Sequence, residues 1–202
     1  MNLLEGLAPA TLDARGFTWE RLLRWEPLPG GGIRAAAPPD TDYFRDPAGE
    51  KIRVNGPFLW RSVAGDFVAR ARVRPAFGGM YDAGGLLVWQ DEERWAKLCF
   101  ERTNFGTTAA ISVVTRGLSD DANGLDLAVP DLWLQVCRSG DTFGMQYALD
   151  GERWRKVRRF HLPLSPTLRV GLFVQSPKAA GTTADFLWFS VESRTADTRT
   201  GV

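Results

Sequence analysis

One short segment carries side chains that could together bind a polar ligand. Along residues 95–101 an aromatic ring, an ammonium, a thiol and a carboxylate alternate with three apolar side chains. Successive residues of a β-strand point to opposite faces, so the pattern predicts Trp95, Lys97 and Glu101 on one face and the apolar residues on a core face. The polar face is either a solvated outer surface or the floor of a groove.

Two other stretches carry polar groups beside glycines or between apolar runs. In residues 78–85, four glycines surround Tyr81 and Asp82, a pattern typical of an irregular edge or bulge, or of a loop that closely approaches a ligand. Residues 115–123 predict a polar loop. Its carboxylates, including Asp120, lack the spacing of a calcium hand, and we expect no metal site.

The motifs of common enzymes are missing. The single histidine, His161, has no serine in a Gly-x-Ser-x-Gly turn to activate. A glycosidase needs two carboxylates that flank the scissile bond, and no predicted strand carries such a pair on one face. Glu101 could still pair across strands with Asp82 or Asp120, so catalysis stays open, although the sequence favours a protein that is not an enzyme. Two cysteines and one histidine cannot make a tetrahedral zinc site, and we expect no cofactor.

The elements that must position these groups are strands. From about residue 33 onward, short runs of period-two alternation are separated by Gly, Pro, Asn or Asp. The predicted strands are Gly32–Ala37, Phe58–Ser62, Asp66–Arg74, Gly84–Trp89, Trp95–Glu101, Ala109–Thr115, Leu132–Arg138, Thr142–Leu149, Trp154–Arg158, Leu168–Ser176 and Ala184–Glu192. Eleven strands favour an all-β fold of two packed antiparallel sheets in one domain, residues 1–202. The core spans about residues 17–192, with frayed ends on both sides, and residues 17–25 are either a strand or a short helix.

The composition excludes several classes of protein. Lys and Arg number 25 and Asp and Glu 24, and this net charge of +1 disfavours a nucleic-acid partner. The apolar runs are too short to cross a membrane, and residues 1–15 lack the pattern of a secretory signal. Cys99 and Cys137 lie in apolar strands, as expected of buried thiols without a disulfide. We therefore expect a cytoplasmic protein, either a monomer or a homodimer.

Several motifs in order along the chain resemble one known family. They are Thr41–Arg45, Tyr81–Leu86, Trp95–Glu101, Val114-Thr115 with Ser119-Asp120, and Tyr147–Trp154. This series is similar to the YesU-like family, a domain of unknown function (1349) also named after a regulation of enolase protein, in the concanavalin-A-like lectin/glucanase superfamily. The resemblance covers about residues 19–192. It implies a jelly-roll sandwich with one concave sheet, the surface on which relatives in the superfamily hold sugars.

The resemblance also implies a set of ligand-binding residues. They are Asp42, Tyr81, Asp82, Trp95, Lys97, Glu101 and Asp120. This chain departs from the family pattern at two places: Ala83 stands where Gln usually follows Tyr-Asp, and Asp121 where Trp usually follows Ser-Asp. These departures remove one amide and one ring, so a shared ligand would be held differently or not at all.

Three functions fit these residues. The first is a non-catalytic module that binds a carbohydrate or another small polar ligand: an aromatic face stacks on the sugar ring, while carboxylates and a Lys97–Glu101 pair bind its hydroxyls. The second is a structural or regulatory domain whose concave face binds a protein or a second copy. The third is a weak glycosidase or lyase that uses Glu101. We favour the first.

Overall fold

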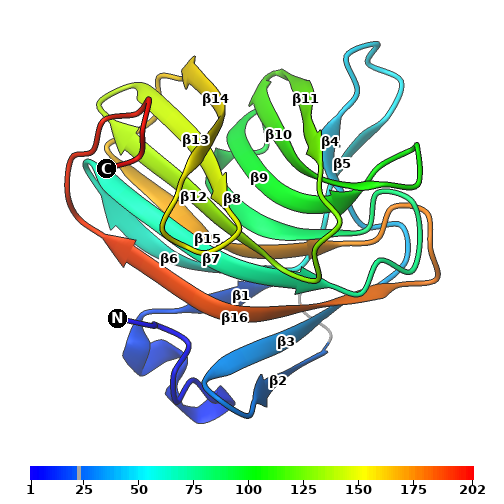
Figure 1. Ribbon diagram of the computed structural model, residues 1–202, viewed down its shortest axis with the longest axis horizontal. Coiled ribbons are helices and arrows are strands. Elements are labelled where there is room, and N and C mark those ends of the chain that lie inside the picture. The colour runs from blue at the N-terminus through cyan, green and yellow to red at the C-terminus, as the bar shows by residue number, and fades with distance from the viewer. Residues whose placement is uncertain (22–23) are drawn as a thin grey trace.

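The computed structural model describes residues 1–21 and 24–202 and contains two seven-stranded antiparallel sheets (Figure 1). Sheet A has the order β1 (Thr18–Glu20), β6 (Phe58–Ala64), β15 (Thr167–Gln175), β8 (Ala83–Asp91), β9 (Arg94–Arg102), β10 (Thr108–Arg116) and β11 (Leu118–Asp126). Sheet B has the order β14 (Arg155–His161), β13 (Thr142–Ala148), β12 (Leu132–Ser139), β7 (Phe67–Pro75), β16 (Thr182–Glu192), β3 (Gly32–Ala37) and β2 (Arg24–Leu28).

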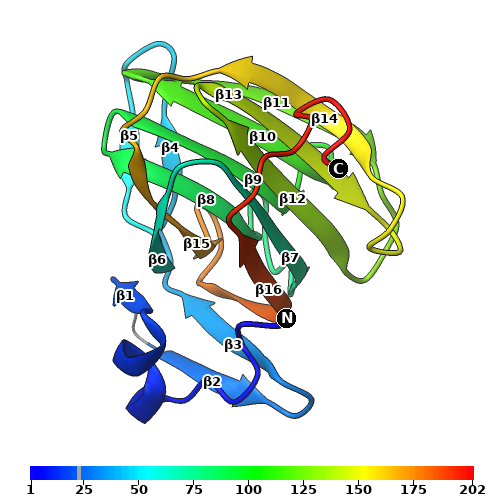
Figure 2. The ribbon, with the colours of Figure 1, turned by 90° about the vertical axis from the view of Figure 1, so that its left-hand side faces the viewer.

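Four shorter elements complete the described chain. Strands β4 (Tyr43–Arg45) and β5 (Ile52–Val54) form a separate hairpin, and η1 (Pro9–Thr11) and η2 (Asp13–Arg15) are single 3-10 turns. Figure 2 shows these turns and β1 to β3 at one end of the sandwich, with β10, β11, β13 and β14 at the other. No helix among the described residues has the length and apolar character needed to span a bilayer.

The predicted two-sheet antiparallel sandwich is confirmed, and each of the eleven predicted strands corresponds to an observed strand. The polar loop predicted over residues 115–123 is wrong, because β10 turns at Gly117 and pairs with β11. Strand β11 lies at the sheet edge and is mostly exposed, so it lacks the apolar alternation that reveals a strand. Residues 17–25 were expected to form a strand or a short helix. Within them, residues 18–20 form β1 and Arg24 begins β2, while Leu22 and Leu23 lie outside the described residues.

The main core lies between the sheets. On β9, the apolar side chains of Ala96, Leu98 and Phe100 point into it, as alternation predicts. A second apolar cluster lies on the outer face of sheet A, and it contains Trp95 and Cys99 from the same strand. Sheet A is therefore covered on both faces, which explains why most of its central residues are buried.

The chain ends differ from the expected frayed segments. Near the N-terminus, Leu4 and Leu7 are buried in the main core. At the C-terminus, residues 193–202 lie on the outer face of sheet B, where the side-chain amide of Gln146 donates to the Thr198 carbonyl oxygen at 3.2 Å. Gln135 donates to the carbonyl of Gly201 at 2.9 Å. These buried amides need partners, and the backbone of the tail supplies them.

Candidate functional site

The β4–β5 hairpin, which we call the strap, crosses the outer face of sheet A. At one end, the Thr41 hydroxyl accepts a 3.0 Å hydrogen bond from the Ser176 backbone N–H, beside β15. At the other, the Arg45 backbone N–H donates to Ser119 Oγ of β11 at 2.9 Å, and its guanidinium donates to the Gly117 carbonyl. The strap is therefore tied near both ends of a five-strand span of sheet A.

Under part of the strap, aromatic rings form the second cluster. The Tyr43 ring makes edge contacts with Trp95, Trp89 and Phe173, with centroid separations from 5.6 to 6.2 Å. Trp95 is 0% exposed, stacks on Trp89 and donates from its indole N–H to the carbonyl of Glu92 at 3.2 Å. The structure therefore does not offer the Trp95 ring as a platform for a sugar, because residues distant in sequence cover it.

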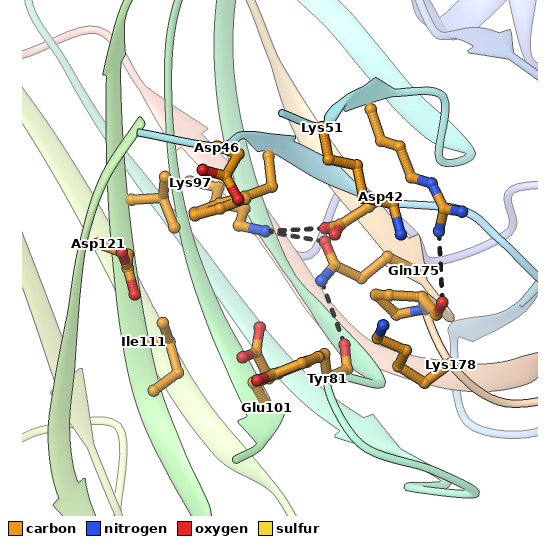
Figure 3. A pocket seen from close by; sticks show the side chains of 14 residues that line it. Asp42, Asp46, Lys51, Tyr81, Lys97, Glu101, Ile111, Asp121, Gln175 and Lys178 are labelled. Carbon is orange, nitrogen blue, oxygen red and sulfur yellow. Dashed lines mark hydrogen bonds and ion pairs between the residues drawn. The ribbon is translucent and has the colours of Figure 1, made fainter. Parts of the chain in front are cut away.

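Beside these rings the strap and sheet A enclose a cavity of about 280 Å³, the strap cavity (Figure 3). Its lining residues are Asp42, Phe44, Asp46, Lys51, Arg53, Tyr81, Lys97, Glu101, Ile111, Val113, Asp121, Gln175, Pro177 and Lys178. Four of the seven predicted site residues are among them: Asp42, Tyr81, Lys97 and Glu101. Asp121 and Lys178 lie on opposite sides of the cavity in Figure 3.

The ammonium of Lys97 is buried at the inner wall. It donates to the side-chain oxygen of Gln175 at 2.9 Å and lies 3.6 Å from a carboxylate oxygen of Asp42 (Figure 3). Burial acts to lower the pKa of Lys97, but neighbouring acidic groups, Asp42 first among them, raise it above its ordinary value. Lys97 is thus a fixed cation. Its ion-pair partner among the described residues is Asp42, so the expected Lys97–Glu101 pair is not formed.

Glu101 lies two strand positions beyond Cys99 on the same face. Burial raises the pKa of Glu101 to about 7, against the opposing effect of Lys97. The Cys99 thiol, whose pKa is also raised by burial, donates to a Glu101 carboxyl oxygen at 3.5 Å. Near neutral pH, Glu101 therefore exists in both forms, and its neutral form both donates and accepts hydrogen bonds.

Tyr81 lies at the cavity wall with an unusual backbone. Its φ of 66° is in the left-handed region, which bulky side chains rarely adopt. The backbone N–H donates to the Arg102 carbonyl at 2.7 Å, and the carbonyl accepts from Gln175 at 3.2 Å. Strained residues held in this way cluster at functional sites.

Asp82 and Asp120 do not line the cavity. Asp82 is fully buried, and its carboxylate accepts 2.8 Å hydrogen bonds from the Ser176 hydroxyl and the Gly79 N–H, which organises the loop that carries Tyr81. The Asp120 side chain is 60% exposed and forms a 2.9 Å ion pair with Arg158, which joins β11 to β14 across the sandwich edge.

The sequence prediction missed several cavity residues. Gln175 ends an apolar strand, and the sheet register aligns it with Ala83 and Glu101 on neighbouring strands. A polar residue at the end of an otherwise apolar strand could have predicted that Gln175 belongs to the site. Asp121, one residue beyond the predicted Asp120, faces the cavity because adjacent strand residues point to opposite sides. The strap residues Phe44, Asp46, Lys51 and Arg53 gave no such signal.

One family model matches most of the chain. The model of the family described as "Protein of unknown function (DUF1349)" matches residues 23–194. The chain belongs to this family. It is 28% identical over 152 residues to "Regulation of enolase protein 1" of Saccharomyces cerevisiae, a match that covers 75% of this chain and 76% of the yeast protein.

Solved structures show the same fold. A functionally unknown protein from Saccharomyces cerevisiae matches with a TM-score of 0.80 and 25% identity, over 90% of this chain and 98% of that one. The carbohydrate-binding module CBM66 from Bacillus subtilis matches with a TM-score of 0.56 and 17% identity, over 88% of this chain and 96% of that one. A Bacteroides ovatus GH43B protein matches with a TM-score of 0.68 and 16% identity, but the match spans only 36% of that chain. The last two similarities concern the fold alone.

Proposed function

We propose that this protein is a non-catalytic binding domain that holds a carbohydrate or another small polar ligand in the strap cavity. One observation carries the proposal: a buried ammonium, a carboxyl group with a pKa near neutrality and further carboxylates line one hollow. Together they provide donors and acceptors for adjacent hydroxyl groups. A cavity of about 280 Å³ fits a ligand at the small end of the usual range, such as a monosaccharide.

The cavity walls also supply apolar surface. Phe44, Ile111 and Val113 line it beside the polar groups, and the C–H face of a pyranose would pack against them. This arrangement replaces the platform expected from Trp95. The similarity to the fold of a carbohydrate-binding module supports the proposal only by analogy.

The two alternatives have less support. For a glycosidase, the expected partners of Glu101 are engaged elsewhere, Asp82 with Ser176 and Asp120 with Arg158. For a protein-binding concave face, the strap leaves a small hollow rather than an open sheet surface. The name of the yeast relative refers to regulation of enolase and favours a protein partner for that relative.

Calorimetric titration with neutral, acidic and amino monosaccharides and their disaccharides tests the proposal. We expect at least one sugar to bind with a stoichiometry of one and a Kd below about 1 mM, a free energy near −4 kcal/mol. Asp121→Asn should weaken that binding roughly tenfold, because it removes the charge from one cavity wall. Asp120→Asn is the matched control, since the adjacent carboxylate lies outside the cavity, and it should bind like the wild type.

Three results would contradict the proposal. They are the absence of saturable binding across the panel, equal losses in the two aspartate variants, and hydrolysis of a bound disaccharide that Glu101→Gln abolishes. The last result would establish the glycosidase alternative.

A further inference from the structure

The outer face of sheet B carries a second group of side chains that neither core uses. Trp133 of β12 and Trp188 of β16 lie on the two strands that flank Arg72 of β7, and the register aligns all three. The Arg72 guanidinium is 6.0 Å from the Trp133 ring centroid, and the two indole centroids are 6.0 Å apart. The two half-buried indole rings thus contact each other, and the Arg72 guanidinium lies beside the ring of Trp133.

A similar contact lies nearby. The Arg70 guanidinium is 5.4 Å from the ring of Trp154, the residue just before β14. Its Nε donates to the neutral side chain of Gln135 at 2.6 Å. Three of the eight tryptophans of the chain therefore lie on this side of sheet B, outside the main core and the second cluster, and outside a small cluster of Val68, Cys137 and Ala196.

On this face the carboxylates lie close to the sheet, and the guanidinium groups lie on the solvent side of them. Asp131 binds Arg72 through two hydrogen bonds of 2.7 and 3.1 Å, and Asp185 binds Arg34 through two of 2.6 and 2.9 Å. Both aspartate side chains are only 10% exposed, whereas those of Arg34, Arg72 and Arg74 are 41 to 47% exposed. The buried carboxylates hold the guanidinium groups in place, and solvent meets mainly positive charge.

The balance of charge leaves this surface cationic. Arg34, Arg72 and Arg74 share the two covered carboxylates, while Arg70 contacts the neutral side chain of Gln135. Glu26, which lies 3.8 Å from Arg34, adds one negative charge at the rim, and Glu192, near Arg70, is paired with Arg194. Nη1 of Arg72 has no hydrogen-bond partner among residues 1–21 and 24–202. Fixed guanidinium groups with free N–H donors bind carboxylates well, and indole rings bury apolar side chains.

We propose that this tryptophan–arginine face, formed by Trp133, Trp154, Trp188, Arg70, Arg72 and Arg74, docks an acidic protein segment in which carboxylates alternate with apolar side chains. Trp and Arg are among the residues enriched at the energetic centres of protein interfaces. Charge complementarity favours an acidic segment over a neutral saccharide, which would leave the guanidinium charges uncompensated. The face lies on sheet B, so this proposal is independent of the strap cavity on sheet A.

Fluorescence anisotropy with labelled twelve-residue peptides tests the proposal. The probe alternates Glu with Leu, and the comparison peptides alternate Gln or Lys with Leu. The Glu peptide should bind at least tenfold more tightly than either comparison peptide at low salt, and binding should weaken at 0.3 M NaCl. Arg72→Gln and Trp188→Ala should each weaken it at least fivefold.

Arg169→Gln is the matched control. Arg169 is also a half-exposed arginine, 4.9 Å from the ring of Trp60 and paired with Glu20, but it belongs to sheet A. Its substitution should leave peptide binding unchanged. The proposal is overturned if the Gln peptide binds equally well or if all three variants behave alike. Equal binding of a twelve-residue oligothymidylate would also overturn it, because charge alone would then explain the attraction. Circular dichroism of each variant separates lost binding from lost folding.

Discussion

The outer faces of the two sheets carry similar residues, but these residues are buried on sheet A and partly exposed on sheet B. On sheet A, Trp95 and Lys97 are covered by the strap, and the rings become a second core with a polar cavity beside it. On sheet B, no such hairpin covers Trp133, Trp188 and Arg72. The two tryptophan rings there remain half-buried. The same alternation thus produces a core, a cavity or an exposed surface according to what lies above it. An aromatic residue on an outward strand face is therefore not by itself evidence of a binding platform.

The largest expected effect is a difference in the free energy of unfolding between substitutions of a buried tryptophan on sheet A and a half-buried tryptophan on sheet B. Trp95→Ala should lower the free energy of unfolding by about 3–5 kcal/mol, because it empties a closely packed cluster. Trp188→Ala should cost less than about 1.5 kcal/mol, since its ring is partly solvated and lies outside both clusters. Urea denaturation measures both values. Equal losses would show that the strap does not distinguish the two faces.

The next effect concerns the buried carboxyl group of the strap cavity. The pKa of Glu101 is 4.5 in the unfolded reference and about 7 in the folded protein, so between these pH values only the folded state keeps the proton. The free energy of unfolding should therefore fall as pH rises from about 4.5 to 7 and stay lowered above pH 7. Glu101→Gln removes this contribution, and the variant should be more stable than the wild type at pH 8 by up to roughly 3 kcal/mol.

Chemical denaturation of both proteins at pH 5 and pH 8 checks this expectation. Asp120→Asn serves as the control, because the Asp120 side chain lies outside the cavity and is 60% exposed. An unchanged difference between wild type and Glu101→Gln at the two pH values would show that Glu101 titrates as in solvent.

The smallest effect tests the backbone at Tyr81. Asn tolerates the left-handed conformation better than Tyr, so Tyr81→Asn should change the free energy of unfolding by less than about 1 kcal/mol. Binding of the best sugar should weaken several-fold, because the ring at the cavity wall is lost. Thermal denaturation and calorimetry measure the two quantities. A stability loss above about 2 kcal/mol would instead assign the ring to the core.

Much of the fold was predictable because its signals are local. Period-two alternation and turn residues identified eleven strands and placed Trp95, Lys97 and Glu101 on one face of β9. Strands β4 and β5 were missed because three-residue strands are too short for a periodic signal. Strand β11 was missed because its polar residues resemble those of a loop.

The candidate site was predictable only in part. One cavity is lined by four of the predicted residues, Asp42, Tyr81, Lys97 and Glu101. The other three have different positions: Asp82 organises the loop that carries Tyr81, Trp95 packs in the second cluster, and Asp120 pairs with Arg158 at the sandwich edge. That these residues bind a ligand stays a prediction. Asp120 and Asp121 differ by one position, and the face each occupies depends on the start of a strand that the pattern did not reveal.

By itself, the sequence determined the all-β class, most strands and the side chains that share a strand face, because neighbouring residues alone control these properties. The tertiary structure decided which of those faces is covered. The strap reaches sheet A from residues 43–54, and Gln175 reaches the ammonium of Lys97 from a strand 78 residues away in the chain. Such contacts depend on the path of the whole chain and on close packing between distant segments, which no local pattern encodes.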